Sequence, residues 1–225
     1  MSVSSQQPNL YRRLRHWGKQ IGLRRVVDLV RRRESWSSDW KAIGFARDLH
    51  IPFDPPMAKI PITVQLLTAD LADRMFDLTA PGISADEHQL RKSRGELWAA
   101  GIGTGYVAVT ESGEPAYCQW LIGPTHNLQI HEFFDGVFPE LGPNDALLEA
   151  AFSLEAFRGL GIMPAAMARI ATQGTAIGAT RIITFVTEDN IPSIKGCERS
   201  GFAPYTHRTV SWRGLRRRVQ FTGPT

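Results

Sequence analysis

A glycine-containing junction in the second half of the chain has the residue types and spacing of an anion-binding site. Its residues are Arg158, Gly159, Leu160, Gly161 and Ile162. An apolar run at 146–154 precedes the junction, and a helix expected at 164–177 follows it. Glycines let the backbone approach a ligand closely, and the unpaired N–H groups of a helix start converge where the helix dipole is positive. Such a site suits a diphosphate, and Arg158 adds a positive charge, although a plain strand–turn–helix junction would also use glycines.

A second cluster of informative residues follows the apolar, β-branched run at 181–186. Asn190 precedes a helix that we expect at 191–200, and Ser193 lies three residues further on. Gly201 stands at the C-terminal end of that helix, where glycine commonly closes helices. Asn190 also suits the N-cap of the helix, so its role is either structural or functional.

Acidic and histidine side chains supply the candidates for proton transfer. Glu149 is the acidic residue of the otherwise apolar run at 146–154. A carboxylate buried in a strand is costly unless it faces a cleft, which makes Glu149 a candidate general base. His131 and Glu132, within an expected strand at 129–134, are rival candidates for the same role.

The elements that must position these residues form an α/β (α+β) pattern. Strands are expected at 43–51, 62–67, 106–109, 116–122, 129–134, 146–154, 181–186, 205–210 and 216–221. Helices are expected at 68–80, 84–99, 164–177 and 191–200, with Thr68 and Ser84 as N-caps. This order matches neither a repeating βαβ array nor an all-β domain.

The N-terminal part of the chain reads as an extension. Apolar residues recur at helical spacing over 10–33, opposite a face of Arg and Lys, which predicts one or two amphipathic basic helices. Such a helix either packs on the domain with a solvated basic face or contacts an anionic membrane surface or an acidic partner. Four prolines within 52–61 predict a linker. We therefore expect an extension over 1–60 and a main domain over 61–225.

The glycine-containing junction resembles motif A of the GCN5-related N-acetyltransferase (GNAT) superfamily. That motif reads Arg/Gln-x-x-Gly-x-Gly/Ala between the fourth strand and the third helix of the family. Arg158 stands in its first position and Gly161 in its fourth. Met163 stands where the family prefers Gly or Ala, which adds bulk near the pyrophosphate or the substrate mouth.

The second cluster resembles motif B of the same superfamily at the expected distance. Asn190, Ser193 and the pair Gly201–Phe202 all have the spacing of that motif. Two linked motifs in a fitting order of elements are more specific than either alone. The resemblance covers roughly residues 61–221, and it implies the acyl-CoA N-acyltransferase fold, a mixed central sheet whose fourth and fifth strands splay apart, with an N-terminal helical extension outside it.

The resemblance implies direct acyl transfer from acetyl-CoA as a co-substrate. Acetyl-CoA would lie between the strands at 146–154 and 181–186, with its pyrophosphate on the backbone N–H groups of 158–163. Backbone around Ser153 and Leu154 would pair with the pantetheine arm, and Asn190 and Ser193 would belong to the same site. A primary amine of a small molecule would attack the thioester, with an amino sugar as the suggested acceptor. The chemistry needs no metal, and no metal-ligand spacing is visible.

The resemblance also points to candidates for the general acid that protonates the CoA thiolate. Many relatives place a tyrosine seven residues after the motif B asparagine, and Cys197 stands there in this sequence. A thiol with a pKa of about 8.5 could protonate the CoA thiolate, or it could be a small buried residue. Tyr205 lies a few residues further on and could replace it. Glu149 lies on the strand that family members use for the base.

Composition and charge exclude several classes of protein. Of the 225 residues, 43% are hydrophobic and 21% are charged, which excludes a wholly disordered chain and a collagen-like one. Two cysteines exclude a disulfide framework and favour a reducing, cytoplasmic compartment. No apolar stretch is long enough to span a membrane, and no secretory signal is expected.

The net charge of +4 is unevenly distributed. Residues 1–35 carry +7 and residues 206–225 carry +5, which leaves −8 for the rest. No helix-turn-helix, zinc or RNA-binding signature accompanies the basic ends, so no specific nucleic-acid partner is expected. The alternatives to an enzyme are a GNAT-fold CoA-binding module without turnover and a module that acts at the inner membrane surface through residues 10–33.

Overall fold

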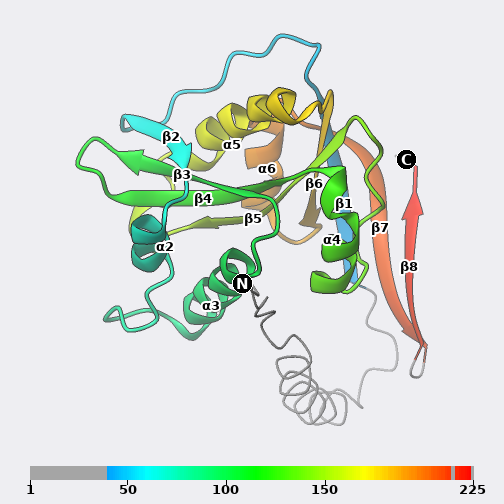
Figure 1. Ribbon diagram of the computed structural model, residues 1–225, viewed down its shortest axis with the longest axis horizontal. Coiled ribbons are helices and arrows are strands. Elements are labelled where there is room, and N and C mark those ends of the chain that lie inside the picture. The colour runs from blue at the N-terminus through cyan, green and yellow to red at the C-terminus, as the bar shows by residue number, and fades with distance from the viewer. Residues whose placement is uncertain (1–39, 214–215, 224–225) are drawn as a thin grey trace, which may run out of the picture. The chain divides into compact units, whose positions relative to one another are not determined.

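The computed structural model describes residues 40–213 and 216–223, and the region at 10–33 lies outside these residues. Eight strands form one sheet in the order β2-β3-β4-β5-β6-β1-β7-β8 (Figure 1). The strands are β1 (Trp40–Asp48), β2 (Ile62–Leu66), β3 (Thr104–Thr110), β4 (Pro115–Ile122), β5 (Asp145–Ser153), β6 (Arg181–Thr187), β7 (Ala203–Arg213) and β8 (Arg216–Thr222). The helices are α2 (Ala69–Met75), α3 (Ala85–Ala100), α4 (Asn127–Phe133), α5 (Ile162–Thr172) and α6 (Ile191–Arg199).

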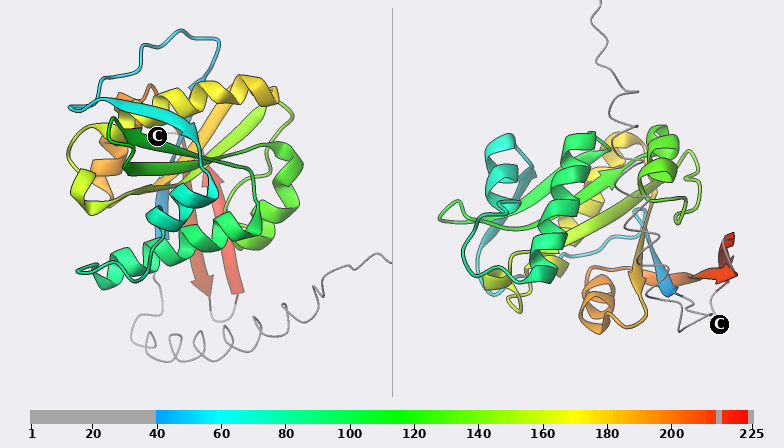
Figure 2. Two further views of the ribbon diagram at one scale, coloured as in Figure 1. Left: turned by 60° about the vertical axis from the view of Figure 1, so that its left-hand side comes forward. Right: turned by 90° about the horizontal axis from the view of Figure 1, so that it is seen from below.

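The two faces of the sheet are covered by different helices (Figure 2). Apolar residues of α2, α3 and α4 pack with Trp120, Leu147 and Phe185 on one face. Residues of α5 and α6 pack with Tyr117 and Leu148 on the other face. The expected α/β architecture with a mixed sheet is therefore confirmed, because β5 and β6 run parallel whereas their neighbours pair antiparallel.

The expected helix starts are found with their caps. The Thr68 side chain accepts a hydrogen bond from the N–H of Leu71, and the Ser84 side chain accepts one from Glu87. The helix after Thr68 ends at Met75, earlier than Pro81, and a turn of 3₁₀-helix at Gln173–Ile177 follows α5.

The segment expected to be a strand at 129–134 is instead the helix α4, so that prediction was wrong. The physical reason is the spacing of its apolar side chains. Ile130 is buried and Phe133 and Phe134 are half-buried, whereas His131 is exposed. Apolar positions at i, i+3 and i+4 form one face of a helix, and a strand would have buried alternate residues.

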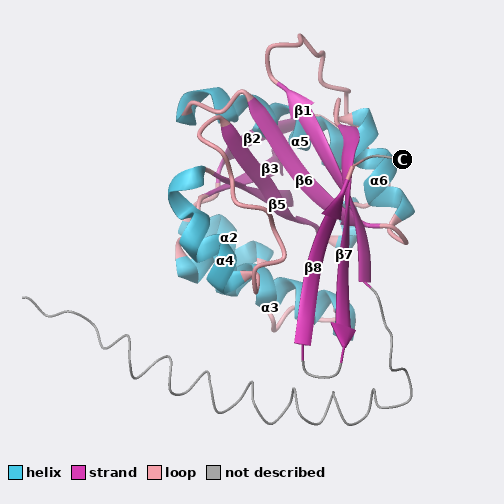
Figure 3. Cartoon of the chain, turned by 90° about the vertical axis from the view of Figure 1, so that its right-hand side faces the viewer, coloured by secondary structure: helices cyan, strands magenta, loops and turns pink. Residues whose placement is uncertain are grey.

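The strand expected at 43–51 is β1, and it lies inside the sheet (Figure 3). It pairs antiparallel with β6 on one side and with β7 on the other. Residues 40–210 and 219–223 belong to one compact unit. Among the described residues, the sheet therefore includes a strand that precedes the proline-rich segment at 52–61.

The strands β5 and β6 are hydrogen-bonded at one end only. Their parallel pairing runs from Asp145 opposite Arg181 to Leu147 opposite Ile183. Further along, Ala150 has a φ of 61°, and the register between β4 and β5 shifts between Cys118 and Trp120. Such a bulge bends the strand, and here it accompanies the separation of β5 from β6.

Candidate active site

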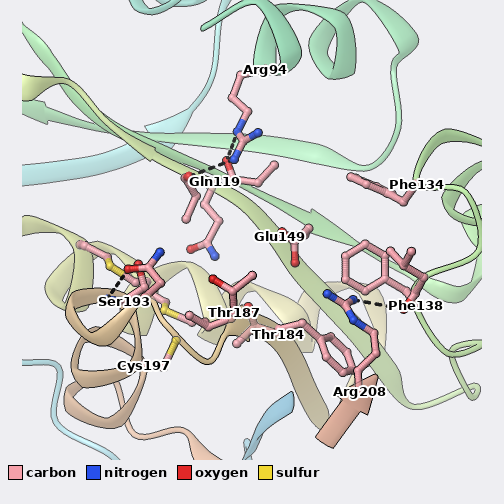
Figure 4. Close-up of a pocket in the computed structure, with 18 of the residues that line it drawn as sticks. Arg94, Gln119, Phe134, Phe138, Glu149, Thr184, Thr187, Ser193, Cys197 and Arg208 are labelled. Atoms are coloured by element: carbon pink, nitrogen blue, oxygen red, sulfur yellow. Dashed lines mark hydrogen bonds between the residues drawn. The ribbon is translucent and has the colours of Figure 1, made fainter. Parts of the chain in front are cut away.

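A cleft of about 360 Å³ opens where β5 and β6 separate (Figure 4). Its lining combines both strands with α5, α6 and the segment after α4, and β1, α3, β4 and β7 each contribute one residue. The polar and charged residues of this lining are Arg94, Gln119, Glu149, Thr184, Thr187, Asn190, Ser193, Cys197 and Arg208. The site thus joins residues from nine regions of the chain, from Trp40 of β1 to Arg208 of β7.

The glycine-containing junction at 158–162 precedes Met163, which lines this cleft, but the junction residues themselves are not part of the lining. Gly159 and Gly161 have φ values of 76° and 73°, and Gly161 is the N-cap of α5. No heavy atom lies within 4 Å of the position of a Cβ on Gly159, so the backbone there is open to a ligand. Met163, in the first turn of α5, lines the cleft and packs over Gly196 of α6. The bulk expected from Met163 therefore lies in the wall between the two helices.

A buried acid holds the arginine of the junction. Arg158 Nη2 lies 3.6 Å from Glu87 Oε2, and Arg91 donates to Glu87 Oε1 through Nε at 3.0 Å and Nη2 at 2.7 Å. Glu87 is only 3% exposed, whereas Arg158 is about half-exposed. The ion pair connects the junction to α3 and leaves the guanidinium of Arg158 accessible to solvent.

The start of α6 forms one wall of the cleft. Asn190 Oδ1 accepts a hydrogen bond from the N–H of Ser193 at 3.2 Å, so Asn190 is the N-cap of this helix. Both side chains also line the cleft, so the structural role of Asn190 does not exclude contact with a ligand. The expected glycine at the other end is found, since Gly201 has a φ of 84°.

The two candidate acids differ in position. Cys197 lines the cleft and is 1% exposed, and burial raises the pKa of its thiol to about 12. Tyr205 lies outside this cleft, beside Arg181 in a separate depression. Burial likewise raises the pKa of its phenol to about 12. Each group is thus a weaker acid than its free side chain.

Glu149 reaches the cleft from β5, beside the bulge. Its Oε2 atom is buried, and it has no hydrogen-bond partner among the described residues. Burial raises the pKa of this carboxyl group, and the backbone N–H of Ala150 and the charge of Arg94 partly oppose that effect. A carboxylate in such a place takes up a proton more readily than an exposed one. The predicted base is therefore the group in the cleft whose environment suits that role.

The remaining predicted site residues, the junction at 158–162 included, do not line the cleft. His131 and Glu132 are exposed on α4, and the ring of His131 packs against Gly136. Ser153 ends β5, and the N–H of Leu154 donates to the carbonyl of Ala116.

Comparison of the sequence with protein-family models and with curated proteins finds no match. Comparison with solved structures finds matches. An acetyltransferase of the GNAT family from Colwellia psychrerythraea matches with a TM-score of 0.51 at 15% identity, over 84% of this chain and 58% of that one. A GCN5-related N-acetyltransferase from Sphaerobacter thermophilus matches with a TM-score of 0.50 at 14% identity, over 97% of this chain and 70% of that one. The chain has the GNAT fold. It spans just under three-fifths of the length of the first of these GNAT structures.

The GNAT cleft also contains charged residues that the sequence analysis missed. Arg94 of α3 donates to the carbonyl groups of Ala150 and Ala151 at 3.1 and 3.4 Å, so it holds the bulge of β5. Arg208 of β7 is buried in the opposite part of the cleft. The alternation of residues in β7 is the signal that could have found it, because Arg208 shares the buried face with Thr206 and Val210.

No helix among the described residues is long and apolar enough to cross a membrane.

Proposed function

We propose that this GNAT-fold chain is an acyl-CoA-dependent N-acyltransferase that transfers acetyl from acetyl-CoA to a primary amine of a small molecule. One observation carries the proposal. The separation of β5 from β6 opens a cleft in which the start of α5, the start of α6 and a carboxylate of raised pKa meet. A thioester placed between the two strands would lie close to a base and to an anion-binding helix start.

The residues present suit the co-substrate. The N–H groups at the start of α5 have no carbonyl partner within the helix, because they precede its first turn. The open backbone at Gly159 and the charge of Arg158 fit a pyrophosphate there. Beyond Leu147, β5 has no pairing with β6, so the backbone near Ser153 and Leu154 is the proposed partner of the pantetheine arm.

Glu149 is the proposed base. It takes a proton from the acceptor ammonium group, and the freed lone pair forms a bond to the thioester carbonyl carbon. The C–S bond breaks, the nitrogen loses its second proton as the amide forms, and the CoA thiolate is protonated to the thiol. The chain contributes mainly alignment of the two substrates and this proton transfer.

Cys197 remains the proposed acid within the cleft, although its environment does not favour the role. A pKa of about 12 makes proton transfer from Cys197 to a thiolate unfavourable, since a free thiol has a pKa of about 8.5. Tyr205 has a similar pKa and lies outside the cleft. Water that enters the cleft is the alternative proton source.

Calorimetric titration with acetyl-CoA tests the co-substrate assignment. We expect binding, and we expect Arg158→Met to weaken it by roughly three- to tenfold through loss of one charged contact. Arg74→Met is the matched control, because Arg74 is a surface arginine of α2 paired with Glu114 at 2.7 Å. Absence of heat and of thermal stabilisation at millimolar acetyl-CoA would overturn the assignment.

A CoA-binding module without turnover is the second candidate function. Met163 in the cleft wall and the weak acidity of Cys197 favour it. A broad screen of primary amines, with release of free CoA as the readout, separates the two functions. The screen includes glucosamine, because an amino sugar is the acceptor that the motif resemblance suggests. Binding of acetyl-CoA with no amine-dependent release of CoA would favour the module.

Residues 10–33 support a further proposal from sequence alone, since they lie outside the described residues. Their basic, amphipathic pattern suits a contact with an anionic membrane surface or an acidic partner. Co-sedimentation with anionic and with neutral vesicles, for the full chain and for a variant lacking residues 1–39, tests the membrane contact. Equal sedimentation of the two proteins would refute it.

A further inference from the structure

Arg208 is a buried cation in the lining of the cleft. It is 3% exposed, and within residues 40–213 and 216–223 it forms no ion pair with a carboxylate. Its one hydrogen bond in this part of the chain runs from Nη1 to the carbonyl of Val137 at 3.1 Å. The Nε atom is buried without a partner among the same residues. A buried charge without a partner is costly, so its presence calls for a physical reason.

Aromatic rings surround the guanidinium group. Its carbon lies 4.5 Å from the ring centroid of Trp40, 4.9 Å from that of Phe185 and 5.1 Å from that of Phe138. Cation–π contacts of this kind stabilise the charge and fix the plane of the guanidinium. They supply no hydrogen-bond acceptor for Nε or Nη2. The rings therefore orient Arg208 but leave one of its edges unpaired.

Two other arginines of the described chain place this edge on a carboxylate, whereas Arg94 places it on the carbonyl groups of Ala150 and Ala151. Arg181 donates through Nε and Nη2 to the two carboxylate oxygens of Asp145, at 2.7 and 2.8 Å. Arg91 donates through the same two atoms to a single oxygen, Oε1, of Glu87. The two parallel N–H groups of this edge match the spacing of a carboxylate, which is why the pairing recurs in proteins. Arg208 has the same edge and, within the described chain, no carboxylate on it.

Glu149 does not fill that place. The charge of each affects the pKa of the other, but the two side chains form no ion pair. Both line the same end of the cleft, and Figure 4 shows them directed toward one space beside Phe134 and Phe138. An acceptor in that space would meet a carboxylate and a guanidinium at the same time.

We propose that Arg208 binds a carboxylate of the acceptor, so that the acceptor is a small amino acid or other amino-carboxylate whose amine faces Glu149. The inference rests on the proposed acyltransferase function and names its substrate class. The charges are complementary, because the ammonium group meets the base while the acceptor's carboxylate neutralises the buried cation. A neutral amino sugar would leave Arg208 unpaired, which costs affinity.

A panel of matched acceptors tests the proposal in the unmodified protein. Each amino acid, with β-alanine and 4-aminobutyrate, is compared with its carboxamide and with the amine that lacks the carboxyl group. Glucosamine and glucosamine 6-phosphate represent neutral and phosphorylated acceptors. We expect kcat/KM for the best carboxylate to exceed that for its carboxamide by roughly ten- to hundredfold. Equal rates for the pair, or a preference for glucosamine or its phosphate, would overturn the proposal.

Variants separate binding of the acceptor from a structural role of Arg208. In Arg208→Met the ratio of carboxylate to carboxamide should fall to about one, while acetyl-CoA affinity stays within about twofold. Arg208→Lys should restore part of the preference, since lysine keeps the charge but not the two parallel donors. Arg181→Gln is the control outside the cleft and should retain the full ratio. A full carboxylate preference in Arg208→Met would refute the role of Arg208.

These experiments also separate failure of the acyltransferase function from failure of the carboxylate-bearing acceptor. If acetyl-CoA does not bind, the acyltransferase function itself fails, and the substrate class fails with it. If acetyl-CoA binds and amines are acylated without a carboxylate preference, only the present inference fails.

Discussion

At the scale of single residues, the cleft holds two charged groups of opposite sign that the core accommodates at a cost. Glu149 has a buried oxygen without a partner, and Arg208 has a buried nitrogen without one, among the residues described. Burial raises the pKa of the acid and lowers the pKa of the arginine, so in each case the charged form is disfavoured. Buried charged groups without hydrogen-bond partners are often found at functional sites, where reactivity requires residues that lower the stability of the fold.

Glu149→Gln should abolish most of the transfer activity without loss of acetyl-CoA binding. Removal of a general base typically lowers kcat by about 10²- to 10⁴-fold. Wild-type kcat should rise with pH through a midpoint above the usual value of about 4.3 for Glu, because burial raises the pKa of Glu149. Steady-state rates as a function of pH measure both effects. A variant that retains the wild-type acid limb would assign that limb to another group.

The same substitution should stabilise the fold at neutral pH. The folded-state pKa of Glu149 lies above its unfolded value, so the folded protein binds the extra proton between the two values. Wild-type stability therefore falls as the pH rises from about 4.3 through the folded pKa. Glutamine cannot ionise, so Glu149→Gln does not lose this stability as the pH rises. Its Tm should exceed that of the wild type by roughly 2–4 °C for each kcal/mol by which the free energy of unfolding is higher. Thermal unfolding from acidic to neutral pH measures the difference, with Glu132→Gln on the exposed face of α4 as the control.

At the scale of elements, the helix starts around the cleft serve both the fold and the proposed chemistry. The N-cap Asn190 closes α6 through Ser193 and lines the cleft as well. The N-cap Ser84 performs the same local task for α3 but does not line the cleft. The two caps therefore form a matched pair for separating stability from ligand binding.

Asn190→Ala and Ser84→Ala should each lower the free energy of unfolding by about 1 kcal/mol, the usual value of an N-cap side chain. Acetyl-CoA affinity should fall only in Asn190→Ala, because only that side chain lines the cleft. Denaturant titration and calorimetry measure the two quantities. If both variants bind acetyl-CoA as tightly as the wild type, the role of Asn190 is structural alone.

At the scale of the whole molecule, the first described strand joins parts of the sheet that are far apart in the sequence. The strand β1 lies between β6 and β7 and is hydrogen-bonded to both. Its first residue, Trp40, stacks on Arg208 of β7 and lines the cleft. The sheet and one wall of the proposed acceptor site therefore both depend on a segment that precedes the proline-rich linker.

A variant lacking residues 1–39 should fold and bind acetyl-CoA, whereas one lacking residues 1–48 should not fold. The second deletion removes β1, which would leave the edges of β6 and β7 unpaired and the buried side chains of Ala42 and Phe45 missing. Circular dichroism, thermal unfolding and acetyl-CoA titration measure the outcome. Cooperative unfolding of the shorter variant would contradict the role assigned to β1.

Local patterns predicted most of the elements. The caps Thr68, Ser84 and Asn190, the glycine at 201 and the apolar runs at 146–154 and 181–186 are all found near the expected places. These features depend on neighbours within a few residues, which is the range over which propensity and capping act. The error at 129–134 arose because the run is short, and the i, i+3, i+4 spacing of Ile130, Phe133 and Phe134, which marks one face of a helix, was overlooked.

The sequence by itself determined the fold class, the two linked motifs and one carboxylate in a buried strand. Only the tertiary structure decided which charged groups meet in the cleft. Glu149 was recognisable as an acid among apolar neighbours, whereas Arg208 looked like one of several arginines near the C-terminal end. Its burial and its aromatic neighbours follow from β1 lying beside β7, a long-range pairing that no local pattern encodes. Burial and pairing over such distances set the charge balance of the site, and they depend on the assembled sheet.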